Sequence, residues 1–88
     1  MDDKYNMYFF YSKDCDDCAK LKKEIKDSGI LGKLNYLFVD GLDDNTQEFC
    51  DYHNVDKMPR VKIFDSKGNL ALDKTGLFDI SELEELLK

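Results

Sequence analysis

The sequence contains no tryptophan, one proline, one histidine and only five glycines among its 88 residues. With so few prolines and glycines it has no stretch typical of a flexible or proline-rich linker, and we find no repeat and no low-complexity segment. A chain of this length can build one hydrophobic core but is too short for two. We therefore predict a single domain that spans residues 1–88.

Positive charge and long apolar runs are also scarce. The 13 basic residues are outnumbered by 19 acidic ones, and the net charge of −6 opposes association with nucleic acid or anionic membrane surfaces. No apolar run is long enough to span a membrane, and Met1–Lys4 leads into a short mixed strand and not into the apolar core of a signal peptide. We expect a cytoplasmic monomer with neither nucleic acid nor a membrane as its partner.

Cysteine occurs only three times, and this odd number does not suit a small secreted domain held together by disulfides. Two of the three, Cys15 and Cys18, form a C-x-x-C motif. In a reducing compartment this motif indicates redox chemistry or metal binding. A tetrahedral zinc site would need two further ligands, for which only Cys50 and His53 are available. We predict redox chemistry without a bound metal or other cofactor.

Hydrophobic residues make up 42% of the chain, which is enough for a buried core. The aromatic-rich run Tyr5–Tyr11 suits a strand that is buried on both faces. From Cys15 onward, apolar residues recur at helical spacing until Gly29 and Gly32 end the helix. Leu34–Val39 reads as a second strand, and the helical crossover makes it parallel to the first.

The second half of the chain continues with a helix, a hairpin and a short final helix. Asp65–Asn69 is a turn signal between two strand-like runs, with a glycine where a left-handed residue is needed. The predicted elements are a helix capped by Asp43, Asp44 or Asn45 that stops near Asn54, strands Arg60–Phe64 and Leu70–Thr75, and a helix capped by Asp79 or Ser81. The order is β-α-β-α-β-β-α.

The two motif cysteines are expected to differ in reactivity. A helix that begins at Cys15 places its sulfur beside free backbone N–H groups and at the positive end of the helix dipole, which favours the thiolate. Cys18, one turn further on, points along the apolar face of the helix and is therefore shielded. We predict that Cys15 is the attacking thiol and Cys18 the resolving thiol.

Two separate segments carry a wider pattern. Phe9–Cys18, followed by a helix, looks like the approach to the active site of thioredoxins and glutaredoxins, and Met58–Gly68 resembles their cis-proline, strand and hairpin turn. The resemblance runs from about Tyr5 to Leu87. It implies an α/β thioredoxin-like fold with a four-stranded mixed sheet of order 2-1-3-4 between helices. The first two strands are expected to be parallel, with the last two antiparallel to them.

The resemblance also implies a substrate site. In the family, the proline sits in the cis form against the C-x-x-C motif, and the backbone of the preceding residue pairs with the bound substrate. Met58 and Pro59 are therefore expected to bind substrate, with a cis bond between them, a geometry that is uncommon unless the fold requires it.

The motif departs from that of thioredoxins in charge. Thioredoxins usually carry Trp before the first cysteine and Gly-Pro between the cysteines, where this chain has Asp14, Asp16 and Asp17. These carboxylates oppose a thiolate at Cys15 and are expected to modulate its pKa. The position of the buried acid of thioredoxins is occupied by Phe9, so the proton of Cys18 must pass to another group or to water.

The resemblance to glutaredoxins is in size more than in motif. Glutaredoxins usually show Pro-Tyr between the cysteines, Thr-Val before the cis-proline and Gly-Gly after the last strand. Here these positions hold Asp16-Asp17, Lys57-Met58 and a single Gly76, which is a poor pattern for holding glutathione.

These observations predict an enzyme that reduces protein disulfides through Cys15 and Cys18. Its electron donor would be a flavoenzyme of the thioredoxin-reductase type, or glutathione. Two alternatives stay open, a glutathione-dependent reductase of the glutaredoxin type and a thioredoxin-fold module that holds a metal or Fe–S centre through the two cysteines.

Five other polar residues have two interpretations each. Cys50 and His53 are expected to be core residues of the second helix, because a buried Cys packs as a small hydrophobe and a lone His on an apolar face is seldom a ligand. Lys13, Lys57 and Arg60 either face the site and offset its acidic cluster or are solvated surface charges.

Overall fold

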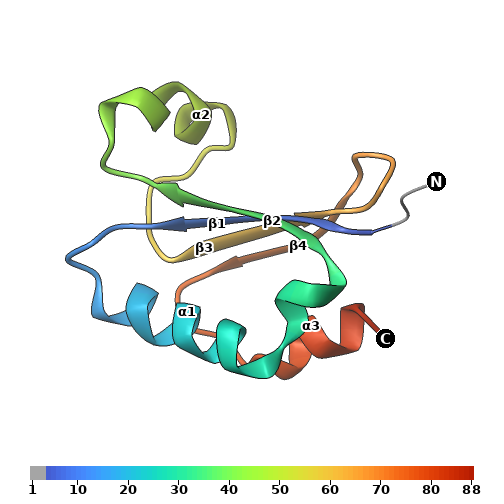
Figure 1. Ribbon diagram of the computed structural model, residues 1–88. Coiled ribbons are helices and arrows are strands. Elements are labelled where there is room, and N and C mark those ends of the chain that lie inside the picture. Colours follow the sequence, from blue (N-terminus) through green and yellow to red (C-terminus); the bar gives the residue numbers. More distant parts are fainter. Residues whose placement is uncertain (1–3) are drawn as a thin grey trace.

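A four-stranded sheet separates two layers of helices in the computed structural model of the protein, which describes residues 4–88 (Figure 1). The sequence prediction for Met1–Lys4 falls largely on residues 1–3, which lie outside the described residues. The elements are β1 (Asn6–Tyr11), α1 (Asp16–Ser28), η1 (Ile30–Lys33), β2 (Asn35–Asp40), η2 (Asp44–Thr46), α2 (Gln47–Tyr52), β3 (Arg60–Phe64), β4 (Leu70–Thr75) and α3 (Ser81–Leu86). Helices α1 and α3 cover one face of the sheet, and α2 covers the other.

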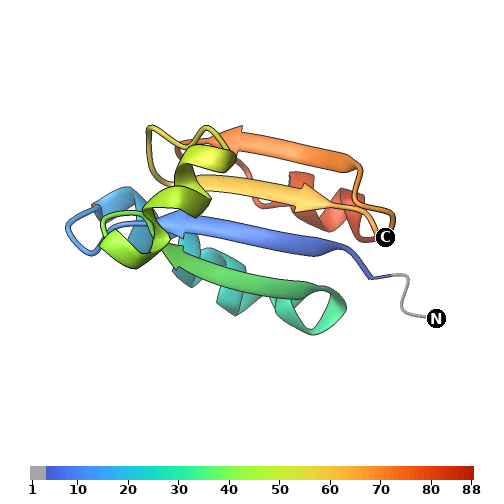
Figure 2. The same cartoon turned by 90° about the horizontal axis from the view of Figure 1, so that it is seen from above.

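The strand order is β2-β1-β3-β4, as predicted, and Figure 2 shows the four strands side by side. Strand β1 is parallel to β2 and antiparallel to β3, and β4 is antiparallel to β3. Strand β4 therefore runs in the same direction as β1. The expectation that both of the last strands run antiparallel to the first two was wrong for β4, because the two strands of a tight hairpin must run in opposite directions.

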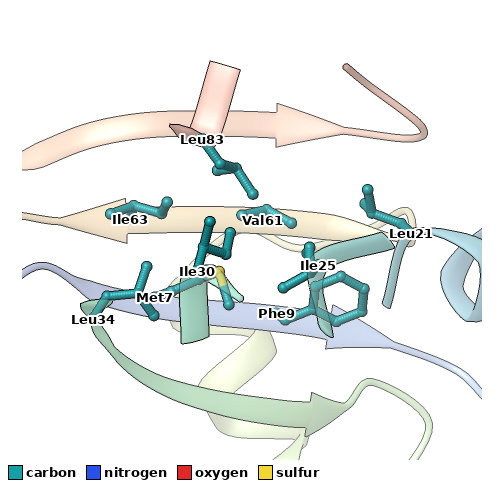
Figure 3. Close-up of a cluster of buried hydrophobic side chains, with 9 residues drawn as sticks. All are labelled: Met7, Phe9, Leu21, Ile25, Ile30, Leu34, Val61, Ile63 and Leu83. Atoms are coloured by element: carbon teal, nitrogen blue, oxygen red, sulfur yellow. The ribbon is translucent and has the colours of Figure 1, made fainter. Parts of the chain in front are cut away.

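The larger core lies between the sheet and helices α1 and α3 (Figure 3). Side chains alternate between the two faces of a strand, so Met7 and Phe9 of β1 point to this side together with Val61 and Ile63 of β3. The cluster is completed by apolar residues of the two helices and of the segment between α1 and β2, which are Leu21, Ile25, Ile30, Leu34 and Leu83. This burial fixes α1, and with it the C-x-x-C motif, against the sheet.

A smaller core lies beneath α2 and contains Phe10, Val39, Cys50 and Val55. It also holds a lysine. Lys62 is only 8% exposed, and its Nζ donates a hydrogen bond to the carbonyl of His53, 2.6 Å away, at the C-terminal end of α2. A cation is favoured at the negative end of a helix, so Lys62 attaches α2 to the sheet.

The ends of the helices follow from their capping residues. Gly29 ends α1 with a left-handed φ of 79°, a conformation that glycine adopts at little cost. Of the predicted caps, Asp43 caps η2, where it accepts a hydrogen bond from the Asn45 N–H, whereas the N-cap residue of α2 itself is Thr46. Asp79 accepts a hydrogen bond from the Ser81 N–H, although Ile80 is the N-cap residue of α3. None of the helices within residues 4–88 is long and apolar enough to cross a membrane.

Candidate active site

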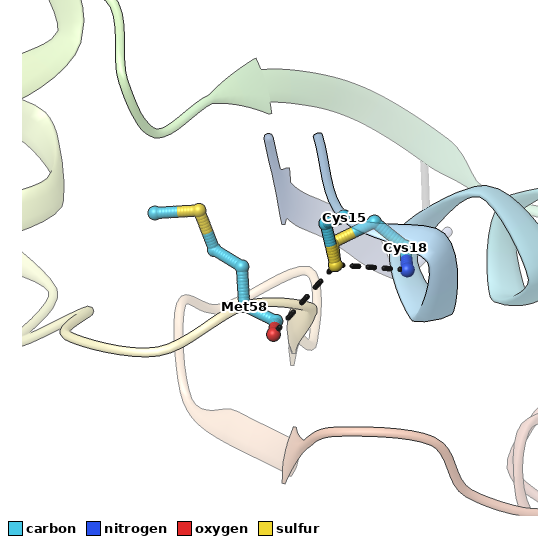
Figure 4. The surroundings of a disulfide bond; sticks show 3 residues. All are labelled: Cys15, Cys18 and Met58. Atoms are coloured by element: carbon cyan, nitrogen blue, oxygen red, sulfur yellow. Dashed lines mark hydrogen bonds between the residues drawn. A yellow bond between two sulfur atoms is a disulfide. The ribbon is translucent and has the colours of Figure 1, made fainter. Parts of the chain in front are cut away.

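Cys15 and Cys18 form a disulfide at the start of α1, with their Cα atoms 5.2 Å apart (Figure 4). Cys15 is the N-cap residue of the helix, and its Sγ accepts a hydrogen bond from the Cys18 N–H at 3.1 Å. Its side chain is partly exposed, whereas Cys18 is 2% exposed. Of the two cysteines, Cys15 is therefore the more accessible to solvent.

The loop before β3 lies opposite the disulfide. The Met58–Pro59 peptide bond is cis, as predicted, and the carbonyl oxygen of Met58 lies 3.9 Å from Cys15 Sγ, although the two residues are 43 positions apart. Figure 4 shows this carbonyl directed at Cys15 while the thioether of Met58 extends away from it. The carbonyl of Pro59 accepts a hydrogen bond from the Gly76 N–H at 2.7 Å, which ties the loop to the end of β4. The role of Met58 and Pro59 in substrate binding stays a prediction.

The acidic residues around the motif are exposed. Asp14 precedes Cys15, and Asp16 and Asp17 belong to the first turn of α1. Within residues 4–88, none of these three carboxylates forms an ion pair. Their negative charge is therefore directed into solvent close to Cys15. Their effect on the thiol stays a prediction.

Of the three basic residues with two possible roles, Arg60 is paired with a carboxylate. Its Nε and Nη2 atoms donate to the two carboxylate oxygens of Asp73 on the neighbouring strand at 2.6 and 2.8 Å. The hydrogen bond from Arg60 is the main cause that lowers the pKa of Asp73. Arg60 is thus neutralised by Asp73, while Lys13 and Lys57 are exposed.

Cys50 of α2 is a core residue, as expected, whereas His53 at the end of that helix is only half-buried and lies outside the buried cluster. Burial raises the pKa of the Cys50 thiol, and the side chain is 1% exposed. His53 contacts the rings of Phe10 and Phe49, and burial, followed by the charge of Lys62, lowers its pKa. Among residues 4–88, no group of three or more His, Cys, Asp or Glu side chains is placed to hold a metal ion.

Sequence reasoning missed three side-chain relationships around the site. Gly41 follows β2, and a Cβ atom at this position would overlap the end of the Met58 side chain. Asp73 holds Arg60, as described above. Lys22 of α1 lies over the rings of Tyr11 and Phe38. For Lys22, the sequence offered one indication of such a contact, a charged residue next to the apolar positions of the helix.

A partly exposed cysteine at a helix N-terminus, with a shielded partner one turn on and a cis-proline loop opposite, points to a dithiol–disulfide oxidoreductase. Residues 2–88 match the family model of the thioredoxin-like domain, and the chain belongs to that family. Proteins of this kind generally act on disulfide substrates together with a reductase.

Solved structures of thioredoxins share this fold. A point mutant of thioredoxin from Halobacterium salinarum superposes with a TM-score of 0.79 at 20% identity, covering 97% of this chain and 73% of that one. Thioredoxin O2 of Arabidopsis thaliana, in the oxidized state, gives 0.80 at 20% identity, with coverages of 98% and 77%. Thioredoxin-2 of the malaria parasite gives 0.80 at 20% identity, with coverages of 98% and 82%. No curated protein matches the sequence.

Proposed function

We propose that this protein reduces disulfides in other proteins, with Cys15 as the attacking thiol and Cys18 as the resolving thiol. The observation that supports this most directly is the asymmetry of the pair: Cys15 is partly exposed at the helix N-terminus, and Cys18 is 2% exposed behind it. The N–H of Cys18, 3.1 Å from Cys15 Sγ, stabilises a thiolate there, as does the helix dipole.

The reaction proceeds by two thiol–disulfide exchanges. The Cys15 thiolate attacks one sulfur of the substrate disulfide, so a Cys15–substrate disulfide forms and the other substrate sulfur leaves as a thiolate that takes up a proton. Cys18 then loses its proton to solvent and attacks the Cys15 sulfur. The second substrate sulfur leaves, and the Cys15–Cys18 disulfide forms. Two electrons pass from the dithiol to the substrate.

The substrate chain would lie between Cys15 and the cis-proline loop. The carbonyl of Met58 already faces Cys15 Sγ, so an extended substrate strand that pairs with the Met58 backbone would bring its sulfur close to Cys15. Such backbone pairing fixes the orientation of the substrate without demanding one particular sequence, which suits an enzyme with several protein substrates.

The oxidised protein must be reduced for another cycle, and a flavoenzyme of the thioredoxin-reductase type is the favoured donor. Glutathione is the second candidate, and it is disfavoured because Lys57-Met58 and the single Gly76 depart from the pattern that holds glutathione. We further propose that the protein works as a monomer in the cytoplasm, where thiols are kept reduced.

The test uses Cys18→Ser and Cys15→Ser as a matched pair. Cys18→Ser should accumulate stable mixed disulfides with proteins of the source cell, which can be released by reductant and identified, whereas Cys15→Ser should trap none. Wild-type protein should reduce an oxidised model protein faster with thioredoxin reductase and NADPH than with glutathione and its reductase. Trapping through Cys15→Ser, or wild-type protein with no turnover from either donor, would refute the proposal.

A further inference from the structure

The ammonium group of Lys22, in the middle of α1, is held over two aromatic rings. Its Nζ lies 4.7 Å from the ring centre of Phe38 on β2 and 5.0 Å from that of Tyr11 on β1. Both distances are within the range of an attractive cation–π contact. Two simultaneous contacts hold the charge on the flank of the helix that faces the sheet.

This position places the charge near Cys18. Residues four apart on a helix are neighbours, with Cβ atoms about 6 Å apart, so Cys18 and Lys22 share one side of α1. Helical side chains also lean toward the N-terminus, so Lys22 covers the preceding turn, which contains Cys18. Tyr11 ends β1 four residues before Cys15. The Lys22 side chain thus lies on the side of α1 that carries Cys18.

The positive charge of Lys22 is not neutralised locally. Other titratable side chains in and beside this part of α1 include Tyr11, Lys13, Asp14, Asp16, Asp17, Lys20, Lys23, Lys26 and Asp40. No carboxylate within residues 4–88 lies at ion-pair distance from Lys22. Phe9 is fully buried, and its ring packs edge-on against that of Phe38. Because Phe9 is apolar, it places no carboxylate in the core beside Lys22.

We propose that Lys22 provides the positive charge that stabilises the thiolate of Cys18 when that residue resolves the mixed disulfide. This inference rests on the proposed function. In the resolution step the Cys18 thiol loses its proton to solvent water, its thiolate forms a bond to the Cys15 sulfur, and the Cys15–substrate bond breaks. The substrate leaves as a thiolate and regains a proton from solvent. Lys22 keeps its own proton and acts only through its charge.

The experiment separates the two exchanges in time. Reduced protein is mixed with dithiobisnitrobenzoate, a chromogenic disulfide. The first coloured thiolate appears when Cys15 attacks the reagent, and the rate of this phase rises with reagent concentration. The second appears when Cys18 displaces the adduct from Cys15, and the rate of this phase is independent of reagent concentration. Cys18→Ser, which should release only the first, identifies the two phases. The second phase is then followed against pH.

Lys22→Met keeps the apolar stem of the side chain over the rings but removes the charge. Its second phase should slow about three- to tenfold below the pKa of Cys18, and the midpoint of its pH profile should rise by about half a unit to one unit. Lys26→Met is the matched control, since it removes the same charge one turn further away, where Nζ lies 5.9 Å from the Phe38 ring centre. Lys22→Arg should restore the wild-type profile.

The outcomes distinguish this inference from the function on which it rests. A wild-type protein that shows no second phase would refute the roles proposed for Cys15 and Cys18. If the wild type shows a normal second phase, and Lys22→Met has the same rate and pH midpoint as its control Lys26→Met, only the role of Lys22 is refuted. Thermal unfolding of each variant verifies that a slower phase is not a loss of fold.

Discussion

The side chain of Met58 occupies the space that Gly41 leaves free. A Cβ atom at Gly41 would overlap the Cε and Sδ atoms of Met58, which are the flexible end of that side chain. The N–H of Gly41 donates to the carbonyl of Tyr11 at 2.7 Å, so the backbone at this point is held in place. The glycine thus sets where the thioether beside the cis-proline loop can lie.

Replacing Gly41 by Ala should move the Met58 side chain without unfolding the protein. Because only flexible atoms must shift, the free energy of unfolding should fall by about 1 kcal/mol or less. The kcat/KM for a protein disulfide should nevertheless change at least about threefold, since the surface beside Cys15 is altered. Gly32→Ala is the control, because a Cβ there meets nothing within 4 Å. Equal activity of the two variants would show that Met58 does not border the substrate.

Asp73→Asn should destabilise the protein because it removes the carboxylate that holds Arg60. The two side chains are 28% and 16% exposed, so the free energy of unfolding at neutral pH should fall by about 1–3 kcal/mol. The folded-state pKa of Asp73 lies below its ordinary value of 3.8. The advantage of the wild type is therefore present above that value and lost as the pH falls through the folded-state pKa.

Urea denaturation across this pH range would test the role of Asp73. Asp27→Asn is a suitable control, because the Lys23–Asp27 pair is solvent-exposed and should contribute little to stability. A difference between wild type and Asp73→Asn that persisted at the lowest pH would mean that the lost stability is not electrostatic.

The lowered pKa of His53 makes stability depend on pH near neutrality. Burial opposes its protonation in the folded state, so its contribution is present above the ordinary pKa of 6.5 and is lost as the pH falls through the lower folded-state value. The free energy of unfolding should decrease between about pH 7 and pH 5. His53→Phe, which keeps an aromatic ring among Phe10 and Phe49, should flatten this dependence. An equally steep decrease in the variant would assign the effect to another group.

Asp16 and Asp17 should tune the dithiol through their charge. Converting both to Asn should lower the pKa of Cys15 by about half a unit to one unit and raise the reduction potential, because a repulsion between negative charges is removed. The difference should shrink in high salt. The control is the double variant Glu84→Gln and Glu85→Gln, which changes the net charge by the same amount but on α3. Thiolate absorbance against pH measures the effect, and an unchanged or higher pKa would leave the two acids as capping or partner-selecting residues.

Cys50→Ala should be a mild change. The buried thiol packs beneath α2, so its loss should reduce the free energy of unfolding by about 1–2 kcal/mol while turnover continues. Turnover with a reductase and denaturation by urea would be measured on the same preparation. Loss of turnover in a folded variant would instead require a relay of three thiols.

Local patterns were sufficient to predict much of the fold. The bounds of the hairpin strands, Arg60–Phe64 and Leu70–Thr75, agree with the structure because a turn signal separates two extended runs. Likewise, the start of α1 follows from Cys15 and its end from Gly29, since capping depends on residues that are close in the sequence. The sheet order and the cis-proline came from the resemblance to thioredoxins and not from local pattern.

The sequence by itself determined the order of the elements, the bounds of the two hairpin strands and which cysteine caps α1, because these properties depend mainly on neighbours along the chain. Only the tertiary structure decided that Arg60 meets Asp73, that Met58 fills the space at Gly41, and that Lys22 lies over Phe38. Each of these contacts joins side chains from different elements or loops, which strand pairing or the packing of a helix against the sheet brings together. Side chains of the same type and spacing would meet different partners in another packing, so no local pattern could identify them.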